Sequence, residues 1–261
     1  MSAPRRRTQR RADLSQHFLR KGATAARVVQ FTTISNNDLV VEIGAGRGAL
    51  TKPLCQRAGK VIAVELDKFL ANKLEAEFGL GVDIVNADIL KVALPTDSYK
   101  VLGNVPYNIT TDIIRRLIEV DNPPLDIWVI VQREAAQRFC GAPYTRENIW
   151  SLKLKPRWHV EIVDRLSRFE FDPPPAVESA LLWLSRRERP LLSVDGEQCF
   201  QAVVQSAYQH DNLKRAMKLW LSRKQFQRLA IDLHFSQEAK PSMLCFEQWL
   251  GIVRFIERNH Y

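Results

Sequence analysis

Residues 39–48 read Leu-Val-Val-Glu-Ile-Gly-Ala-Gly-Arg-Gly, an apolar run that leads into three alternating glycines. Consecutive apolar and β-branched residues of this kind are typical of a strand that is covered on both faces of a sheet. Glycines directly after a strand let the backbone turn tightly and approach a ligand, because no Cβ stands in the way. The stretch therefore predicts a buried strand, a ligand-binding turn and the start of a helix.

Four further apolar runs follow, and segments with helical spacing of Leu, Ile and Phe separate most of them. The runs are residues 61–64, 83–85, 101–102 and 127–131, and the helical segments are residues 49–58, 68–78 and 111–120. Strands that alternate with helices indicate a parallel sheet with helices on both faces. We therefore predict an α/β fold for this part of the chain.

The pattern changes near a basic hinge that holds Arg186 and Arg187, because the helical stretches after it have no strands between them. We predict an α/β domain over residues 14–187 and a small all-helical domain over residues 188–261. Residues 1–13 hold five arginines, one aspartate and few apolar side chains. Such a block cannot bury a core, so we expect it to be a disordered basic arm.

The overall charge favours a polyanionic partner. The 261 residues include 38 Lys and Arg against 29 Asp and Glu, which gives a formal net charge of +9. Nucleic acid is favoured over a membrane, because neither a basic amphipathic helix with a clean apolar face nor a membrane-spanning run stands out. No CxxC or Cys–His pair is present, so we expect no metal site, and free thiols without a secretory signal predict a cytoplasmic protein. The cysteines are Cys55, Cys140, Cys199 and Cys245.

Carboxylates at the next two strand ends predict a nucleoside site. Glu65 ends the second strand, 21 residues after Gly44, where it can accept hydrogen bonds from both hydroxyls of a ribose. Asp88 closes the third strand, where it can accept a hydrogen bond from an adenine amine. The G-x-G-x-G spacing and the preceding Glu42 both differ from the dinucleotide fingerprint G-x-G-x-x-G. A dinucleotide site or a simple tight turn remains open for the glycines alone.

Residues 103–108, Gly-Asn-Val-Pro-Tyr-Asn, follow the fourth strand and suit one kind of chemistry. The exocyclic nitrogen of adenine is a poor nucleophile, because its lone pair is delocalised into the ring. The Asn104 side-chain oxygen and a carbonyl of Val105 or Pro106 can accept its two hydrogens and favour a tetrahedral nitrogen. Tyr107 can stack on an extruded base. An ordinary Asn-x-Pro turn is the alternative, which the upstream Glu65 and glycine turn disfavour.

In this order, the motifs resemble those of the class I methyltransferases, which use S-adenosylmethionine and have a Rossmann-like fold, in their adenine-N6 branch. Residues 14–19, Leu-Ser-Gln-His-Phe-Leu, resemble the Ser-Gln-Asn-Phe-Leu segment of the rRNA adenine dimethyltransferases. Residues 171–177, Phe-Asp-Pro-Pro-Pro-Ala-Val, resemble their Phe-x-Pro-x-Pro-x-Val signature. The resemblance covers roughly residues 13–185. The remaining residues resemble the family only in being helical.

The resemblance implies a site for S-adenosylmethionine and another for the target adenine. Asn104, Tyr107 and Phe171 would hold the adenine, with Phe171 stacking opposite Tyr107. One departure is His17, which stands where the family has Asn and cannot offer an amide's donor and acceptor pair. The residues implied to surround the cofactor are His17, Leu19, Gly44, Gly46, Glu65, Asp88 and Asn104.

Two branches of that superfamily fit, and the erythromycin-resistance (Erm) branch fits better. Gly48, residues 111–115 and the Arg-rich arm resemble the Erm enzymes. The resemblance to the Erm enzymes implies a monomer that methylates adenine N6 in 23S rRNA before ribosome assembly is complete. Such methylation would confer resistance to macrolides, lincosamides and streptogramin B. A 16S rRNA adenine dimethyltransferase of ribosome assembly is the alternative. An adenine-specific DNA methyltransferase and a non-catalytic RNA-binding factor remain as further alternatives.

Two groups of basic residues are candidates for contact with RNA phosphates, although a solvated helix face explains the first almost equally well. The first group is Arg133, Arg138, Arg146, Lys153, Lys155 and Arg157, and the second is Lys214, Arg215, Lys218, Arg223, Lys224 and Arg228.

Overall fold

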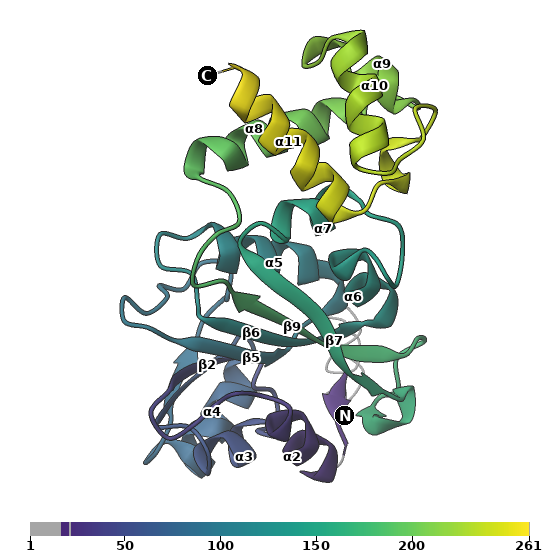
Figure 1. The fold of residues 1–261 in the computed structure, drawn as a ribbon. Helices are drawn as coiled ribbons and strands as arrows, with labels where there is room; N and C mark the ends of the chain where they lie inside the picture. Colours follow the sequence, from purple (N-terminus) through teal and green to yellow (C-terminus); the bar gives the residue numbers. More distant parts are fainter. Residues whose placement is uncertain (1–16, 21, 261) are drawn as a thin grey trace. The chain divides into compact units, whose positions relative to one another are not determined.

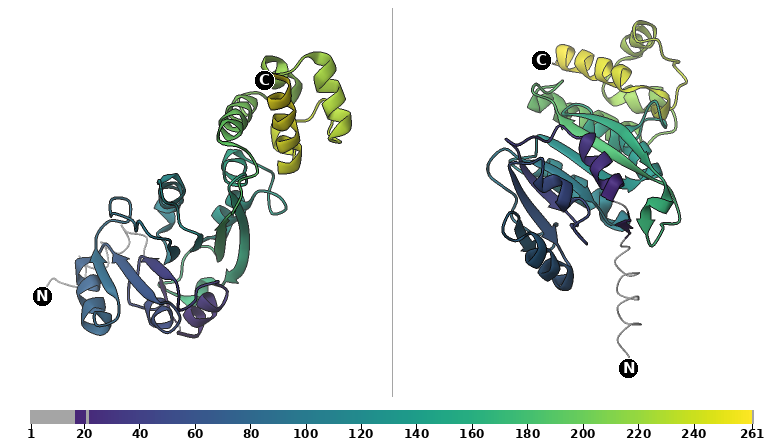
Figure 2. Two further views of the ribbon diagram at one scale, coloured as in Figure 1. Left: turned by 60° about the vertical axis from the view of Figure 1, so that its left-hand side comes forward. Right: turned by 90° about the horizontal axis from the view of Figure 1, so that it is seen from below.

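A computed structural model of the chain describes residues 17–20 and 22–260 (Figures 1 and 2). The predicted arm, residues 1–13, lies outside the described residues. Contacts divide the chain into two compact units. The first unit runs to Ala136 and includes Glu161–Arg186, and the second comprises Gln137–Val160 and the chain from Arg187 onward. The second unit thus joins residues 137–160, which are remote in sequence, to the C-terminal helices.

The sheet has seven strands in the order β4-β3-β2-β5-β6-β9-β7, as predicted for a Rossmann-like α/β fold. Neighbouring strands from β4 to β6 run parallel, and β9 joins β6 antiparallel. Chain order reverses between β2 and β5, and open α/β sheets bind ligands beyond the carboxyl ends of the strands at such a point. The strands are β2 Leu39–Ile43, β3 Lys60–Glu65, β4 Asp83–Asn86, β5 Lys100–Asn104, β6 Asp126–Gln132, β7 Trp158–Leu166 and β9 Ser179–Arg186.

A separate two-stranded ribbon joins the start of the described chain to a distant segment. β1, Phe18–Leu19, pairs antiparallel with β8, Phe171–Asp172. The register sets Phe18 opposite Asp172 and Leu19 opposite Phe171. The Arg47 guanidinium, from the turn after β2, lies 3.1 Å from the Asp172 carboxylate and 4.6 Å from the centre of the Phe18 ring. The ribbon is therefore fastened to the glycine turn.

Helices of the first unit pack on the sheet, as Figure 1 shows for the strands and helices near β2. α4 begins after Asp67, whose side chain accepts hydrogen bonds from the Phe69 and Leu70 N–H groups and so caps the helix. One core cluster joins the apolar faces of the sheet and helices, and includes Val40, Leu102 and Trp128. The helices are α2 Gly22–Gln30, α3 Thr51–Cys55, α4 Lys68–Phe78 and α5 Thr110–Glu119, with the 3₁₀ turns η1 Tyr107–Ile109 and η2 Arg168–Glu170. α6, Arg133–Cys140, begins in the first unit and ends in the second.

Helices of the second unit surround a core of their own, which contains Phe200, Phe226 and the fully buried Trp249. Within this unit Glu147 accepts a hydrogen bond from Lys155, and its backbone carbonyl accepts one from the Tyr208 hydroxyl. The helices are α7 Ile149–Leu154, α8 Val194–Ala207, α9 Leu213–Ala216, α10 Arg223–Asp232 and α11 Phe246–His260, with η3 Met217–Leu219 and η4 Pro241–Met243. Over the described part of the chain, none of the helices has the length and apolar character to cross a bilayer.

Candidate active site

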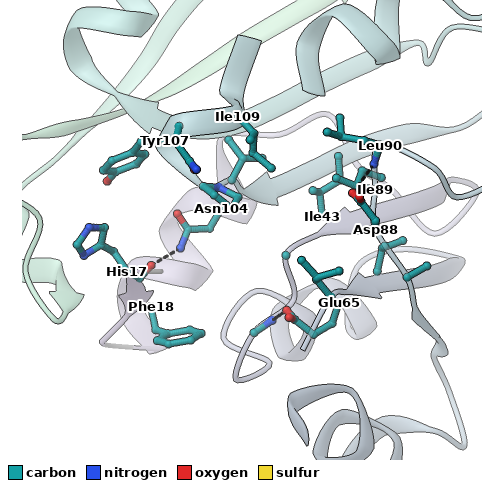
Figure 3. A pocket seen from close by; sticks show the side chains of 18 residues that line it. His17, Phe18, Ile43, Glu65, Asp88, Ile89, Leu90, Asn104, Tyr107 and Ile109 are labelled. Atoms are coloured by element: carbon teal, nitrogen blue, oxygen red, sulfur yellow. Dashed lines mark hydrogen bonds between the residues drawn. The ribbon is translucent and has the colours of Figure 1, made fainter. Parts of the chain in front are cut away.

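A cavity of about 270 Å³ lies at the carboxyl ends of β2, β3, β4 and β5, where the strand order reverses (Figure 3). It brings together predicted residues from five separate segments of the chain. Those that line it are His17, Gly44, Gly46, Glu65, Asp88, Asn104 and Tyr107. Among the described residues, no group of three or more His, Cys, Asp or Glu side chains is arranged to hold a metal ion.

The turn after β2 depends on its glycines. Gly44 and Gly46 have φ values of +68° and +61°, which L side chains rarely adopt. A Cβ on Gly46 would lie 2.9 Å from the Phe18 ring, and a Cβ on Gly44 would lie 3.0 Å from the Asn104 carbonyl oxygen. A side chain at Gly44 or Gly46 would therefore collide with β5 or β1, so the close approach of the turn to these two strands requires glycine at both positions.

Glu65 ties the glycine turn to the end of β3. Its Oε2 accepts a hydrogen bond of 2.8 Å from the Gly46 N–H, and its Oε1 accepts one of 2.8 Å from the Asp67 N–H. Burial raises the pKa of Glu65, although these two N–H donors favour the charged carboxylate. A carboxylate oxygen has a second lone pair, so each can still accept a hydroxyl. Asp88 uses its Oδ1 to accept the Leu90 N–H at 2.9 Å.

Asn104 and Tyr107 are each held by a specific contact. The Asn104 Nδ2 donates to the His17 backbone carbonyl at 2.6 Å, which leaves Oδ1 for an incoming donor. The Tyr107 hydroxyl lies 2.6 Å from the Ser179 hydroxyl, and the phenol ring lies 5.5 Å from the His17 imidazole between ring centres. Burial raises the pKa of Tyr107, so the phenol stays neutral at physiological pH.

Two predicted site residues lie elsewhere. Phe171, expected to stack on a base, is fully buried in the core of the first unit and does not line the cavity. Its partner in the β1–β8 ribbon, Leu19, packs in the same core. Ribbon pairing turns both side chains inward, and the base-stacking role of Phe171 stays a prediction.

Other cavity residues were not predicted. The apolar side chains of Ile43, Leu66, Ile89 and Leu90 form the wall between the strand ends, where a flat aromatic base can be buried. Each of these residues ends a strand or follows one, so its place at a strand end is the feature of the sequence that could have identified it. Ser179 starts β9 and lies far from Tyr107 in sequence, so no local pattern identifies this pair.

Glu42 is a buried carboxyl group directly beneath the glycine turn. Its side chain is fully buried, and among the described residues neither oxygen makes a hydrogen bond of ordinary length, although the nearby Thr51 hydroxyl and N–H favour the charged form. Burial raises the pKa of Glu42 to about 8, from an ordinary value of 4.5. The folded protein therefore holds a neutral carboxylic acid here at neutral pH.

Glu42→Gln is expected to remove a pH dependence of stability. Between about pH 4.5 and pH 8 the folded chain keeps the Glu42 proton and the unfolded chain loses it, so stability falls as pH rises. The loss is about 1.4 kcal/mol per pH unit over that window. Urea unfolding at pH 5, 6, 7 and 8 should show a shallower decline for the variant than for the wild type. Equal declines would contradict a neutral Glu42.

Several residues of the predicted basic groups are paired with carboxylates. Arg133 lies 2.6 Å from Glu178, and Arg157 lies 2.5 Å from Glu197. Lys155 pairs with the buried Glu147. In the C-terminal group, Lys214 and Arg228 form looser pairs of 3.6 Å with Glu238 and Asp232. Lys155 in particular neutralises a carboxylate that is almost wholly buried, so its charge is already used within the second unit.

Comparison with known proteins places this architecture in a family. The model of the family described as ribosomal RNA adenine dimethylase matches residues 7–257. Ribosomal RNA small subunit methyltransferase A of Caldanaerobacter subterraneus is 30% identical over 91% of this chain and 93% of its own length. The rRNA adenine N-6-methyltransferase of Bacillus anthracis is 30% identical over 91% of this chain and 84% of its own.

Among solved structures, the 23S rRNA methyltransferase ErmE covers 92% of this chain and 99% of its own, with a TM-score of 0.86 and 26% identity. A dimethyladenosine transferase from Plasmodium falciparum has the same fold, with a TM-score of 0.76 and 19% identity. The sheet order, the glycine turn and the Asn104–Tyr107 segment all occur within the matched region. The chain belongs to the ribosomal RNA adenine dimethylase family and has the fold of the class I S-adenosylmethionine-dependent methyltransferases.

Proposed function

We propose that this protein transfers a methyl group from S-adenosylmethionine to N6 of an adenine in 23S rRNA, and so confers resistance to macrolides, lincosamides and streptogramin B. The observation that carries the proposal is the likeness to ErmE, which extends over 92% of this chain at a TM-score of 0.86. Family membership supports the coarser activity, methylation of rRNA adenine. The formal net charge of +9 suits an RNA substrate.

The cavity suits S-adenosylmethionine. Glu65 would accept the ribose hydroxyls, Asp88 would accept the adenine amine, and the glycine turn would approach the amino acid portion of the cofactor. When bound, the cofactor supplies a methyl group on a sulfonium. The buried Glu65 carboxylate, held by two N–H donors, offers fixed acceptors without rearrangement. Leu19 has its side chain in the core, so only its backbone is available to this site.

The Asn104–Tyr107 segment suits the target adenine. Asn104 Oδ1 would accept one hydrogen of the amine, since Nδ2 is engaged by the His17 carbonyl. The Pro106 or Val105 carbonyl would accept the other, which favours a tetrahedral nitrogen with its lone pair exposed. Tyr107 would stack on the extruded base. The proton leaves after the methyl group arrives, when the amine has become acidic, so positioning and fixed acceptors supply the catalysis.

A 16S rRNA substrate is the second candidate. The small subunit methyltransferase A of C. subterraneus matches this chain at 30% identity over 93% of its own length, as high as the identity of the B. anthracis relative. The two candidates place the methyl group on different RNA molecules, so one measurement separates them.

Mass mapping of rRNA tests the proposal. The chain and its Asn104→Ala variant are expressed in a macrolide-sensitive bacterium, and 16S and 23S rRNA are digested and analysed separately. We expect N6-methylated adenine in 23S rRNA only with the wild type, together with reduced susceptibility to all three drug classes. Methylation of 16S rRNA alone would overturn the 23S assignment, and the fragment mass would count one or two methyl groups.

Deletion of residues 1–11 is expected to weaken RNA binding and to flatten its salt dependence. Five arginines lie in this segment, and each phosphate contact that is lost reduces the slope of log affinity against log salt by about one. Fluorescence anisotropy with an rRNA fragment at several salt concentrations measures the slope. A variant that replaces the same arginines with lysine should keep the slope, and an unaltered slope after deletion would exclude arm–phosphate contact.

We further propose that residues 14–187 are the catalytic domain and that residues 188–261 are an RNA-binding domain. We also propose that the protein acts as a monomer in the cytoplasm, on rRNA that is not yet fully assembled into ribosomes. Exposed basic side chains of α10 such as Arg228 support the RNA-binding assignment.

A further inference from the structure

The imidazole of His17 lies near the Tyr107 ring at one end of the cavity (Figure 3). The ring centres are 5.5 Å apart and the planes differ by 30°. The His17 Nδ1 lies 2.8 Å from the Pro173 carbonyl oxygen, and since a carbonyl only accepts, Nδ1 carries the hydrogen. The imidazole is thereby anchored on the segment that follows β8.

The phenol of Tyr107 is consequently held at two places. Its hydroxyl is fixed by the Ser179 hydroxyl at 2.6 Å, and its ring is stacked with the imidazole at 5.5 Å between ring centres. A separation of 5.5 Å is that of two rings in direct contact, so no third ring fits between them. A target base that stacks on Tyr107 would therefore use the other face.

His17 contacts both residues proposed to hold the target base. Its backbone carbonyl accepts the hydrogen bond from Asn104 Nδ2, and its side chain contacts Tyr107. The backbone contact is available to any residue at this position, whereas the ring contact requires a flat side chain. Asparagine, which the resembled segment has here, has no ring to place on Tyr107. The imidazole of His17 is thus an aromatic neighbour of Tyr107 at this end of the cavity.

We propose that His17 is a positioning residue, whose flat ring contacts Tyr107 and fixes the ring plane of the phenol so that the target adenine stacks with its amine at Asn104 Oδ1. This inference rests on the proposed adenine methylation. It differs from the cofactor-binding role predicted for His17, because the ring acts on the base side of the cavity. The side chain then affects the rate of methyl transfer more than the affinity for the cofactor.

Three substitutions test this role. His17→Ala and His17→Asn remove the ring, and His17→Phe keeps a ring but removes the hydrogen bond to Pro173. We expect His17→Ala and His17→Asn to lower the single-turnover rate about tenfold or more, since small misplacements of reacting groups have effects of this size or larger. The Kd for S-adenosylmethionine should stay within about twofold, and His17→Phe should recover most of the rate.

Opposite outcomes would overturn the proposal. A raised Kd for S-adenosylmethionine with an unchanged rate would assign His17 to the cofactor. A faster rate in His17→Ala would mean that the imidazole occupies the base site, and a slow His17→Phe would mean that the Pro173 hydrogen bond matters instead of the ring.

A second readout does not depend on activity. Protein labelled with 3-fluorotyrosine contains five such residues, and the Tyr107 signal is assigned by its loss in Tyr107→Phe. The fluorine resonance of Tyr107 should shift and change width in His17→Ala and stay close to the wild-type position in His17→Phe. An unchanged resonance in His17→Ala would refute the ring contact. If the wild type fails to methylate rRNA while the resonance behaves as expected, the proposed function fails and the ring contact stands.

Discussion

Asn104→Ala is expected to lower the rate of methyl transfer by about 10²–10³-fold, the usual effect of removing one fixed polar group that acts on the reacting centre. The substitution removes Oδ1, the proposed acceptor for the adenine amine, from the last residue of β5. It also removes the hydrogen bond to the His17 carbonyl. Rates are measured under single-turnover conditions with the rRNA fragment identified by mass mapping.

Two further variants make the Asn104 result specific. Asn104→Asp keeps an acceptor but loses the Nδ2 donor, and its negative oxygen would face the His17 carbonyl, so we expect an intermediate rate. Asn37→Ala alters an exposed asparagine outside the cavity and should leave the rate unchanged. RNA affinity should be nearly unaltered in all three. If Asn104→Ala retains more than about a tenth of the wild-type rate, the catalytic assignment of Asn104 is wrong.

Glu65→Gln is expected to raise the Kd for S-adenosylmethionine by about 10- to 100-fold, or about 1.4 to 2.8 kcal/mol. Both carboxylate oxygens accept backbone N–H groups, from Gly46 and Asp67. A glutamine amide has one oxygen, so its NH₂ group must face one of these two donors, and the ribose also loses a charged acceptor. The glycine turn then loses its hold on the end of β3.

Isothermal titration calorimetry with S-adenosylmethionine measures the effect of Glu65→Gln. Glu77→Gln, on the exposed side of α4, is the matched control and should bind the cofactor as the wild type does. A wild-type affinity for Glu65→Gln would remove Glu65 from the cofactor site. Thermal unfolding of both variants shows whether the change is confined to the ligand.

Local sequence was sufficient to predict the parallel strands and the residues at their carboxyl ends. The reason is geometric, because parallel strands bring the residues that follow them to one edge of the sheet. Gly44, Glu65, Asp88 and Asn104 each end a strand or follow one, and all four line the cavity.

Features that depend on tertiary pairing were not predictable in this way. The Phe-x-Pro-x-Pro-x-Val signature identifies Phe171 but not the side toward which its ring points, which the pairing of Leu19 with Phe171 decides. The contact of Tyr107 with Ser179 joins residues 72 positions apart. Likewise, nothing in the sequence of residues 137–160 indicates that they pack with the C-terminal helices.

The ribbon of β1 and β8 has a consequence for the order in which the enzyme matures during translation. β1 is made before every strand of the sheet, but its partner follows much later in the chain, since 152 residues separate Leu19 from Phe171. Until then the nascent chain has no pairing to hold His17 and Phe18 over the glycine turn. A chain that is still being translated therefore lacks this side of the cavity until every strand of the sheet before β9 has been made.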